Sequence, residues 1–135
     1  MVVLKGVPAL LSPELLYALA RMGHGDEIGV ARRRSALTLL EAVLKLLPLD
    51  TYVESPAAVM DLVPSDKTKG LQTPVWRSYQ SILSGAGCMN TLAKIERFEF
   101  YERAKKAFAV VATGETALYG NLILTKGVLA PDALF

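Results

Sequence analysis

Residues 92–112, LAKIERFEFYERAKKAFAVVA, predict a strand, a helix and a second strand in immediate succession. Residues 92–97 are apolar enough for a short strand, and residues 98–107 carry the charges of an exposed helix. The run at 108–112 has the composition of a buried strand. Helices that alternate with strands in this way favour an α/β domain, with helices packed on a mixed β-sheet.

The same alternation continues on the N-terminal side of this stretch. Ser12 and Pro13 suit the cap and the first position of a helix that ends near Gly23. Apolar residues at helical spacing predict further helices at 35–47 and 73–84. Short strands are predicted from Ile28 onward and at 51–53, and a last strand at 121–124. We expect no clear strand or helix at 29–36, a loop or the start of a short helix at 54–60, and a loop at 64–72.

Length and composition exclude several classes of protein. A chain of 135 residues suits a single domain, 1–135, and its 52% hydrophobic content fits a domain that pairs with copies of itself. A lone cysteine, Cys88, allows no intrachain disulfide and fits the cytoplasm. A net charge of +2 is too small to argue for nucleic acid, and Arg32–Arg34 is more typical of a solvated turn. No apolar stretch approaches the length of a membrane span, and the N-terminus does not resemble a secretory signal.

His24 is the only histidine of the chain and lies between two glycines. Histidine has an ordinary pKa close to neutrality, so it is the natural acid–base candidate. Glycines on both sides let a ligand approach the backbone closely, which favours a functional site. A surface turn histidine without a function is the alternative that the residues alone leave open.

Tyr119 and Asn121 form the second candidate site. Two positions apart on a strand, they are predicted to point to the same face, and a phenol with an amide suits sugar hydroxyls. An ordinary strand end is the alternative. The remaining polar and aromatic candidates have plain structural explanations as core, solvated face or turn: Phe98, Phe100, Tyr101, Glu96, Arg97 and Asp50.

Other catalytic motifs are missing from the sequence. It has no phosphate-binding glycine loop, no nucleophile elbow and no metal-ligand spacing. Asp26 and Glu27 are adjacent carboxylates, but neighbours on a strand point to opposite faces and make a poor catalytic pair.

Several segments together resemble the fucose mutarotase and ribose pyranase family. In the N-terminal part they are LKGVP at 4–8, LSPELL at 11–16 and MGHGDEI at 22–28. In the C-terminal part they are IERFEFYERA at 95–104, then Gly114-Glu115 and YGN at 119–121. The similarity covers residues 1–28 and 37 to about 130, and GHGDE followed by YGN is far more specific than either alone.

The resemblance implies a three-layer fold and the interconversion of α and β anomers of L-fucose, without metal or cofactor. In the family, the histidine of this turn is the proton donor, which corresponds here to His24. The tyrosine of the family's FYER segment acts together with that histidine, and it corresponds here to Tyr101. The sugar contacts that it implies are Asp50, Arg97, Tyr101, Tyr119 and Asn121. Members of the family assemble as dimers and as rings of ten, with sites near subunit boundaries.

The implied chemistry needs two proton transfers. One proton goes to the ring oxygen and one leaves the anomeric hydroxyl, which opens the pyranose to an aldehyde. Rotation about the freed carbon and closure then give the other anomer. Acid–base catalysis of this kind contributes about 10²- to 10⁴-fold in rate, which is enough for a reaction that already proceeds unaided.

The chain departs from the family pattern after Ile28. Relatives continue through a strand into an Ala-Asp-x-Asn-Phe-Pro segment, whose aspartate binds sugar and supports the histidine. Here residues 29–36, GVARRRSA, lead directly into the next helix, and no carboxylate replaces that aspartate. The chain thus resembles a shortened or alternatively spliced form with an incomplete, less stable sheet. Two hypotheses follow: an active mutarotase, or a catalytically weak variant that binds sugar or assembles without turnover.

Overall fold

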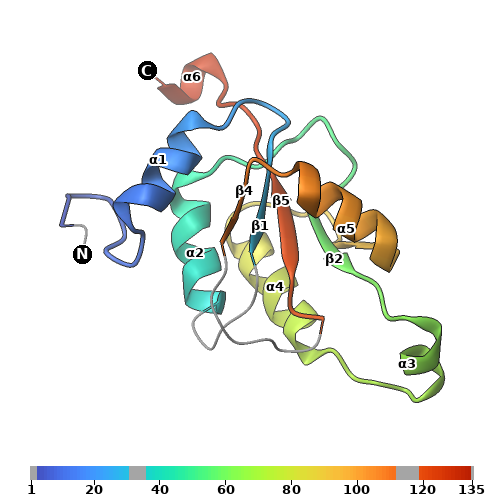
Figure 1. Cartoon of the computed structure of the whole chain (residues 1–135). Coiled ribbons are helices and arrows are strands. Elements are labelled where there is room, and N and C mark those ends of the chain that lie inside the picture. Colours follow the sequence, from blue (N-terminus) through green and yellow to red (C-terminus); the bar gives the residue numbers. More distant parts are fainter. Residues whose placement is uncertain (1–2, 31–35, 112–118, 135) are drawn as a thin grey trace.

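The computed structural model describes residues 3–30, 36–111 and 119–134, and its centre is one mixed five-stranded sheet (Figure 1). The strand order is β3-β2-β5-β1-β4. Strand β5 runs antiparallel to β1 and β2, whereas the outer pairs β1·β4 and β2·β3 are parallel. The strands are β1 (Glu27–Val30), β2 (Ala57–Met60), β3 (Ala93–Ile95), β4 (Ala109–Val111) and β5 (Leu122–Thr125).

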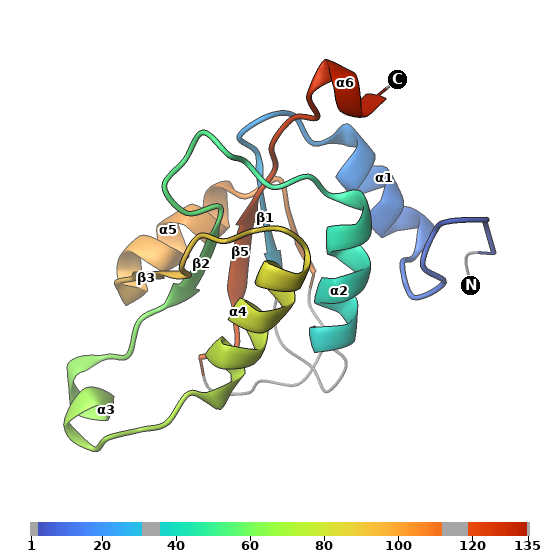
Figure 2. The same cartoon turned by 180° about the vertical axis from the view of Figure 1, so that it is seen from behind.

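Helices cover both faces of this sheet and give three layers. Figures 1 and 2 show α5 (Arg97–Lys106) on one face, and α2 (Ala36–Leu46) and α4 (Pro74–Gly85) on the other. Helix α1 (Pro13–Arg21) lies beside α2 (Figure 2), and two short helices complete the fold, α3 (Pro64–Thr68) and α6 (Pro131–Leu134). The α/β fold with helices packed on a mixed sheet is therefore confirmed.

The main core lies between the sheet and the layer of α1, α2 and α4. Leu122 and Leu124 of β5 belong to this core, together with Leu40 of α2 and Leu83 of α4. Ile123 points the opposite way, since side chains alternate along a strand, and lies on the face that α5 covers. A strand buried on both faces explains why β5 reads as an uninterrupted apolar run.

Helix starts follow the sequence closely. The Ser12 hydroxyl accepts a hydrogen bond from the Leu15 amide at 3.1 Å and caps α1. Helix α4 begins at Pro74 as expected, although the Thr73 side chain makes no capping bond. The Glu96 carboxylate, predicted as part of a solvated face, instead caps α5 by accepting from the amides of Phe98 and Glu99.

The prediction of a strand at 51–53 was wrong. These residues form exposed bends, and the real strand β2 lies a few residues later, where a loop or short helix was expected. Ala57 and Ala58 are poor strand formers by composition. They are almost completely buried and pair with β5 and β3, so tertiary pairing overrides local propensity.

Three smaller expectations also need correction. Gly29 and Val30, which read weakly as a strand, pair within β1, where Gly29 packs against Val110. The loop expected at 64–72 contains α3. The last strand begins at Leu122, so neither Tyr119 nor Asn121 lies on it. Gly114-Glu115 of the family resemblance and most of 29–36 lie outside the described residues.

Membrane-spanning helices were searched for among the described residues. None of the helices found there is long and apolar enough to cross a bilayer.

Candidate active site

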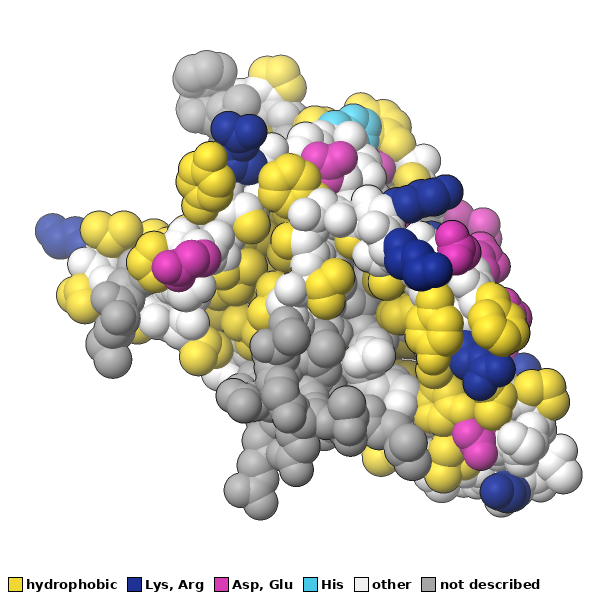
Figure 3. All heavy atoms as spheres, viewed as in Figure 1, with side chains coloured by type: hydrophobic (Ala, Val, Ile, Leu, Met, Phe, Trp, Pro, Cys, Tyr) yellow, Lys and Arg dark blue, Asp and Glu magenta, His cyan; other side chains and the backbone are white. Residues whose placement is uncertain are grey.

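His24 lies in the turn that joins α1 to β1, at one end of the sheet. The Asp26 carboxylate accepts a hydrogen bond from the Gly23 amide at 2.7 Å, which closes the turn. Gly25 has a φ of +86°, in the left-handed region that glycine adopts without strain. Figure 3 shows the imidazole, the only histidine ring of the chain, at the molecular surface.

The imidazole of His24 is paired with the carboxylate of Asp50. Nε2 lies 3.1 Å from Oδ1, and the Tyr52 amide donates to the same oxygen at 3.0 Å. The Tyr52 amide, followed by the His24 hydrogen bond and charge, lowers the pKa of Asp50, although burial opposes this shift. An ionised carboxylate can only accept hydrogen bonds, so Nε2 carries a proton and Nδ1 holds the lone pair of the neutral ring.

The surroundings of His24 leave room for another molecule. The Tyr52 ring lies 5.5 Å from the imidazole, centroid to centroid, and 79% of Tyr52 is exposed. A cavity of about 680 Å³ opens beside the imidazole, between α1 and the segment that follows β5. Its lining is mostly apolar, with His24 and Lys126 as the charged or titratable members.

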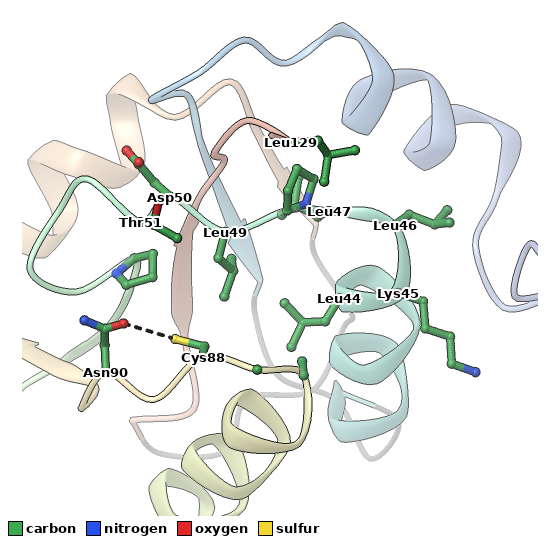
Figure 4. Close-up of a pocket in the computed structure, with 14 residues that line it drawn as sticks. Leu44, Lys45, Leu46, Leu47, Leu49, Asp50, Thr51, Cys88, Asn90 and Leu129 are labelled. Atoms are coloured by element: carbon green, nitrogen blue, oxygen red, sulfur yellow. Dashed lines mark hydrogen bonds between the residues drawn. The ribbon is translucent and has the colours of Figure 1, made fainter. Parts of the chain in front are cut away.

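A second cavity, of about 390 Å³, lies behind Asp50 (Figure 4). It is bounded by the end of α2, by residues 48–51 and by the loop after α4 that carries Cys88 and Asn90. Figure 4 shows the Asp50 side chain directed away from Leu44 and Cys88. The Asp50 carboxylate therefore points toward His24 and away from this cavity.

Tyr119 lies at the opposite end of the sheet, before β5 begins. It adopts a left-handed conformation with a φ of +58°, which is uncommon for a non-glycine residue. Its hydroxyl donates to the Asp66 carboxylate and accepts from the Val63 amide at 3.3 Å. The hydrogen bond to Asp66 raises the pKa of Tyr119. The Trp76 indole donates to the Tyr119 carbonyl at 2.9 Å and holds this segment against α4.

Arg97 is close to Tyr119. Its charge acts on the Tyr119 hydroxyl, and its guanidinium lies over the Phe98 ring at 4.7 Å. Nε of Arg97 is buried without a hydrogen-bond partner among the residues that the structure describes. Tyr101 lies further along α5, is 44% exposed and packs edge-on against Phe98.

The structure thus forms two groups, separated by the length of β5. His24 pairs with Asp50 at one end. At the other end Arg97 lies near Tyr119, and Asn121 directly precedes β5. From Asn121 to Lys126 the chain advances about 17 Å, at roughly 3.3 Å per residue. A single pyranose ring is too small to touch both groups in one chain.

Comparison with known proteins identifies the family of the chain. The model of the RbsD / FucU transport protein family matches residues 31–129. The chain belongs to this family. It is 72% identical to "Fucose mutarotase" of Homo sapiens over 153 aligned positions, which cover 99% of each protein.

Solved structures of the RbsD / FucU family share the fold. The fucose mutarotase of Streptococcus pneumoniae in complex with L-fucose superposes with a TM-score of 0.82 at 41% identity, covering 94% of this chain and all (100%) of that one. FucU from Bifidobacterium longum gives 0.81 at 38% identity, covering 93% of this chain and 100% of its own.

The chain is nevertheless shorter than its human relative in the family. The alignment has 153 positions and the chain has 135 residues, so at least 18 positions (153 − 135) have no residue here. The match to the family model begins at residue 31, within the segment 29–36 in which the sequence departs from the family pattern.

Sequence reasoning missed some residues around the two groups. Tyr52 and Lys126 contact or border the His24 turn, and Asp66 binds the Tyr119 hydroxyl. Tyr52 was assigned to a strand, which hid its place beside His24. For Asp66 no signal was available, because its role depends on a contact with Tyr119, 53 residues away.

Proposed function

We propose that this chain is a sugar mutarotase that interconverts the α and β anomers of L-fucose. The observation that carries the proposal is the His24–Asp50 pair, in which an exposed imidazole on a glycine-flanked turn is held by a buried carboxylate. Membership of the family supports it, together with the fucose mutarotase names of relatives that align along the whole chain.

His24 is the acid–base group in this proposal. Asp50 fixes the ring through Nε2, which directs Nδ1 away from the carboxylate and toward solvent or substrate. In its imidazolium form the ring also carries a proton on Nδ1, and it gives that proton to the ring oxygen while a second group accepts the proton of the anomeric hydroxyl. The aldehyde then rotates, and the reverse transfers close the ring and restore both groups. The resemblance assigns that second role to Tyr101. The burial of Asp50 favours a role behind His24 over direct contact with sugar.

The sugar-holding group is Arg97, Tyr119 and Asn121. Their guanidinium, hydroxyl and amide suit the hydroxyls of a pyranose. Since His24 lies at the other end of the sheet, we propose that a neighbouring copy supplies it and that sites form between copies. The high hydrophobic content and the exposed Phe98 and Tyr101 beside this group support association. The free thiol of Cys88 fits a cytoplasmic enzyme.

A catalytically weak form is the second candidate. At least 18 aligned positions have no residue here. The resemblance implies that the missing segment carries the family's sugar-binding aspartate. Under this hypothesis the chain keeps its sugar contacts or its assembly surface, and it interconverts the anomers slowly or not at all.

Saturation-transfer NMR on equilibrated L-fucose separates these two readings. If the chain is a mutarotase, saturating the α-anomer proton attenuates the β-anomer signal in proportion to enzyme concentration. Line broadening without transfer supports the weak binding form and contradicts the enzyme proposal. The full-length human relative provides the reference rate.

Mixing two inactive variants tests whether copies share a site. His24→Ala and Arg97→Met are each expected to abolish exchange. Dissociated and reassembled together, they regain activity in up to roughly a quarter of the sites, because each site draws its two groups from independent copies. No recovery in a mixed assembly contradicts sharing between copies, whereas the exchange measured on the unaltered chain is unaffected by that outcome.

A further inference from the structure

The dipeptide Lys126-Gly127, directly after β5, touches both of the loops that carry His24 and Asp50. We propose that it is the positioning element that sets the geometry of this pair. The inference rests on the proposed function, because it assigns the dipeptide a role in a reaction that His24 performs.

The Lys126 ammonium fastens the end of α1. Nζ donates to the carbonyl oxygens of Leu19 at 2.7 Å and Met22 at 2.6 Å. The last carbonyls of a helix lack partners within the helix and carry partial negative charge, so a cation placed there satisfies and stabilises them. Met22 lies two residues before His24, and the direction in which α1 ends therefore decides where the turn begins.

The backbone of Lys126 fastens the other side of the same turn. Its carbonyl accepts from the Gly25 amide at 2.8 Å, and its amide donates to the Asp26 carbonyl at 2.8 Å. His24 is thus enclosed between the ammonium contacts on α1 and the backbone bonds at Gly25 and Asp26. In the described part of the chain, no other residue forms hydrogen bonds to the segments on both sides of His24.

Gly127 performs the matching role for Asp50. A Cβ atom added at Gly127 would lie 2.5 Å from the Leu49 carbonyl oxygen and 2.7 Å from Cα of Asp50. The Gly127 amide also donates to the Pro48 carbonyl at 2.8 Å. Because the conflict is with backbone, any side chain at this position displaces the segment that carries Asp50.

Lys126 and Gly127 both affect the distance between the side chains of His24 and Asp50. His24 and Asp50 are 26 residues apart in the chain, and their side chains meet at 3.1 Å. Lys126 fixes the first and Gly127 the second, so consecutive residues set their separation. An error of about 1 Å in such a geometry costs as much as 10²-fold in rate. Lys126 is therefore a positioning residue, because its ammonium binds carbonyls and not substrate.

Lys126→Met tests the first half, because it keeps chain length and backbone bonds and removes the ammonium. We expect exchange per site to fall about 10- to 100-fold, mainly in kcat, with KM nearly unchanged. Lys126→Arg, which still donates to carbonyls, restores most of the rate. Lys105→Met is the matched control: its ammonium pairs with Glu102 on exposed α5, and its rate should equal that of the unaltered chain.

Gly127→Ala tests the second half. It should weaken the His24–Asp50 hydrogen bond and lower kcat to a similar extent. Gly85→Ala is its control, since a Cβ at Gly85 meets nothing within 4 Å. Equal rates in the two alanine variants would contradict the role of Gly127.

Imidazole ¹⁵N spectra make the result independent of turnover, because the chain has one histidine and gives one pair of ring signals. We expect the Nε2–H tautomer in the unaltered chain and in Lys105→Met, and a mixture of tautomers in Lys126→Met and Gly127→Ala. Changed spectra in a chain without exchange support the positioning role while refuting the proposed function. Unchanged spectra in a folded Lys126→Met protein overturn the inference, and so does failure of that variant to fold, which assigns Lys126 to stability alone.

Discussion

Asp50 and His24 share a hydrogen bond but differ sharply in exposure: 4% of the Asp50 side chain is accessible, against 43% for His24. The carboxylate is anchored from behind by the Tyr52 amide, and the imidazole presents its outer side to solvent. This asymmetry supports the proposal that the buried Asp50 orients the ring and that the exposed His24 transfers protons.

Asp50→Asn should therefore impair the reaction without removing its acid–base group. An amide can donate to Nε2 as well as accept from it, so the imidazole is no longer held in one tautomer. We expect anomer exchange to fall about 10- to 100-fold, with little change in KM. The rate is measured by saturation transfer, and Asn90→Asp serves as a control that alters an amide away from His24. An unchanged rate in Asp50→Asn contradicts the orienting role.

The lowered pKa of Asp50 should also make the stability of the protein depend on pH in the acid range. Because its folded pKa lies below the unfolded value of about 3.9, its carboxylate contributes stability that is present above that value. The contribution is lost as pH falls through the lower, folded pKa. Urea unfolding between pH 3 and 7 should show the difference between the unaltered chain and Asp50→Asn shrinking below about pH 4. A difference that stays constant across this range contradicts the lowered pKa.

The raised pKa of Tyr119 should make the stability of the protein depend on pH in the alkaline range. Its pKa is raised by the hydrogen bond to Asp66, so its contribution to stability is complete below the unfolded value of about 10. The contribution is lost as pH rises through the higher, folded pKa. Tyr119→Phe has no such group, and its stability should approach that of the unaltered chain above about pH 10. Parallel unfolding curves up to pH 11 would mean that the Tyr119 hydroxyl titrates normally.

Arg103 joins α5 to β1 through a two-point contact with Glu27, and Thr125 donates to the same carboxylate at 3.0 Å. The paired side chains are only 31% and 21% exposed. Arg103→Met should lower the free energy of unfolding by about 1–2 kcal/mol, after allowance for solvent screening. Lys105→Met, which removes a pair that is 73% and 63% exposed, should cost less than about 0.5 kcal/mol. Equal losses in urea titrations would contradict this ranking.

Sequence patterns predicted the elements whose signals are local. Ser12-Pro13 and Thr73-Pro74 located the starts of α1 and α4, and the apolar run near Leu122 located β5. The sequence did not predict strand β2, because Ala57 and Ala58 adopt strand conformation through pairing with neighbouring strands and not through their own propensity.

The arrangement of the site depended on topology, which the sequence did not supply. The resemblance implied His24 as the proton donor and Tyr119 as a sugar contact, but β5 runs antiparallel to β1 and places the two at opposite ends of the sheet. Asp50 was expected as a sugar contact by resemblance. Its pairing with His24 depends on the close approach of Gly127 to the chain at Leu49, which only the folded backbone reveals.

Anomer exchange of L-fucose by the unaltered chain and by His24→Ala, recorded side by side with saturation-transfer NMR, tests the central claim most directly. We predict concentration-dependent transfer between the anomer signals for the unaltered chain, and transfer at the uncatalysed rate for a folded His24→Ala protein. Equal transfer by both proteins would contradict the assignment of proton transfer to His24.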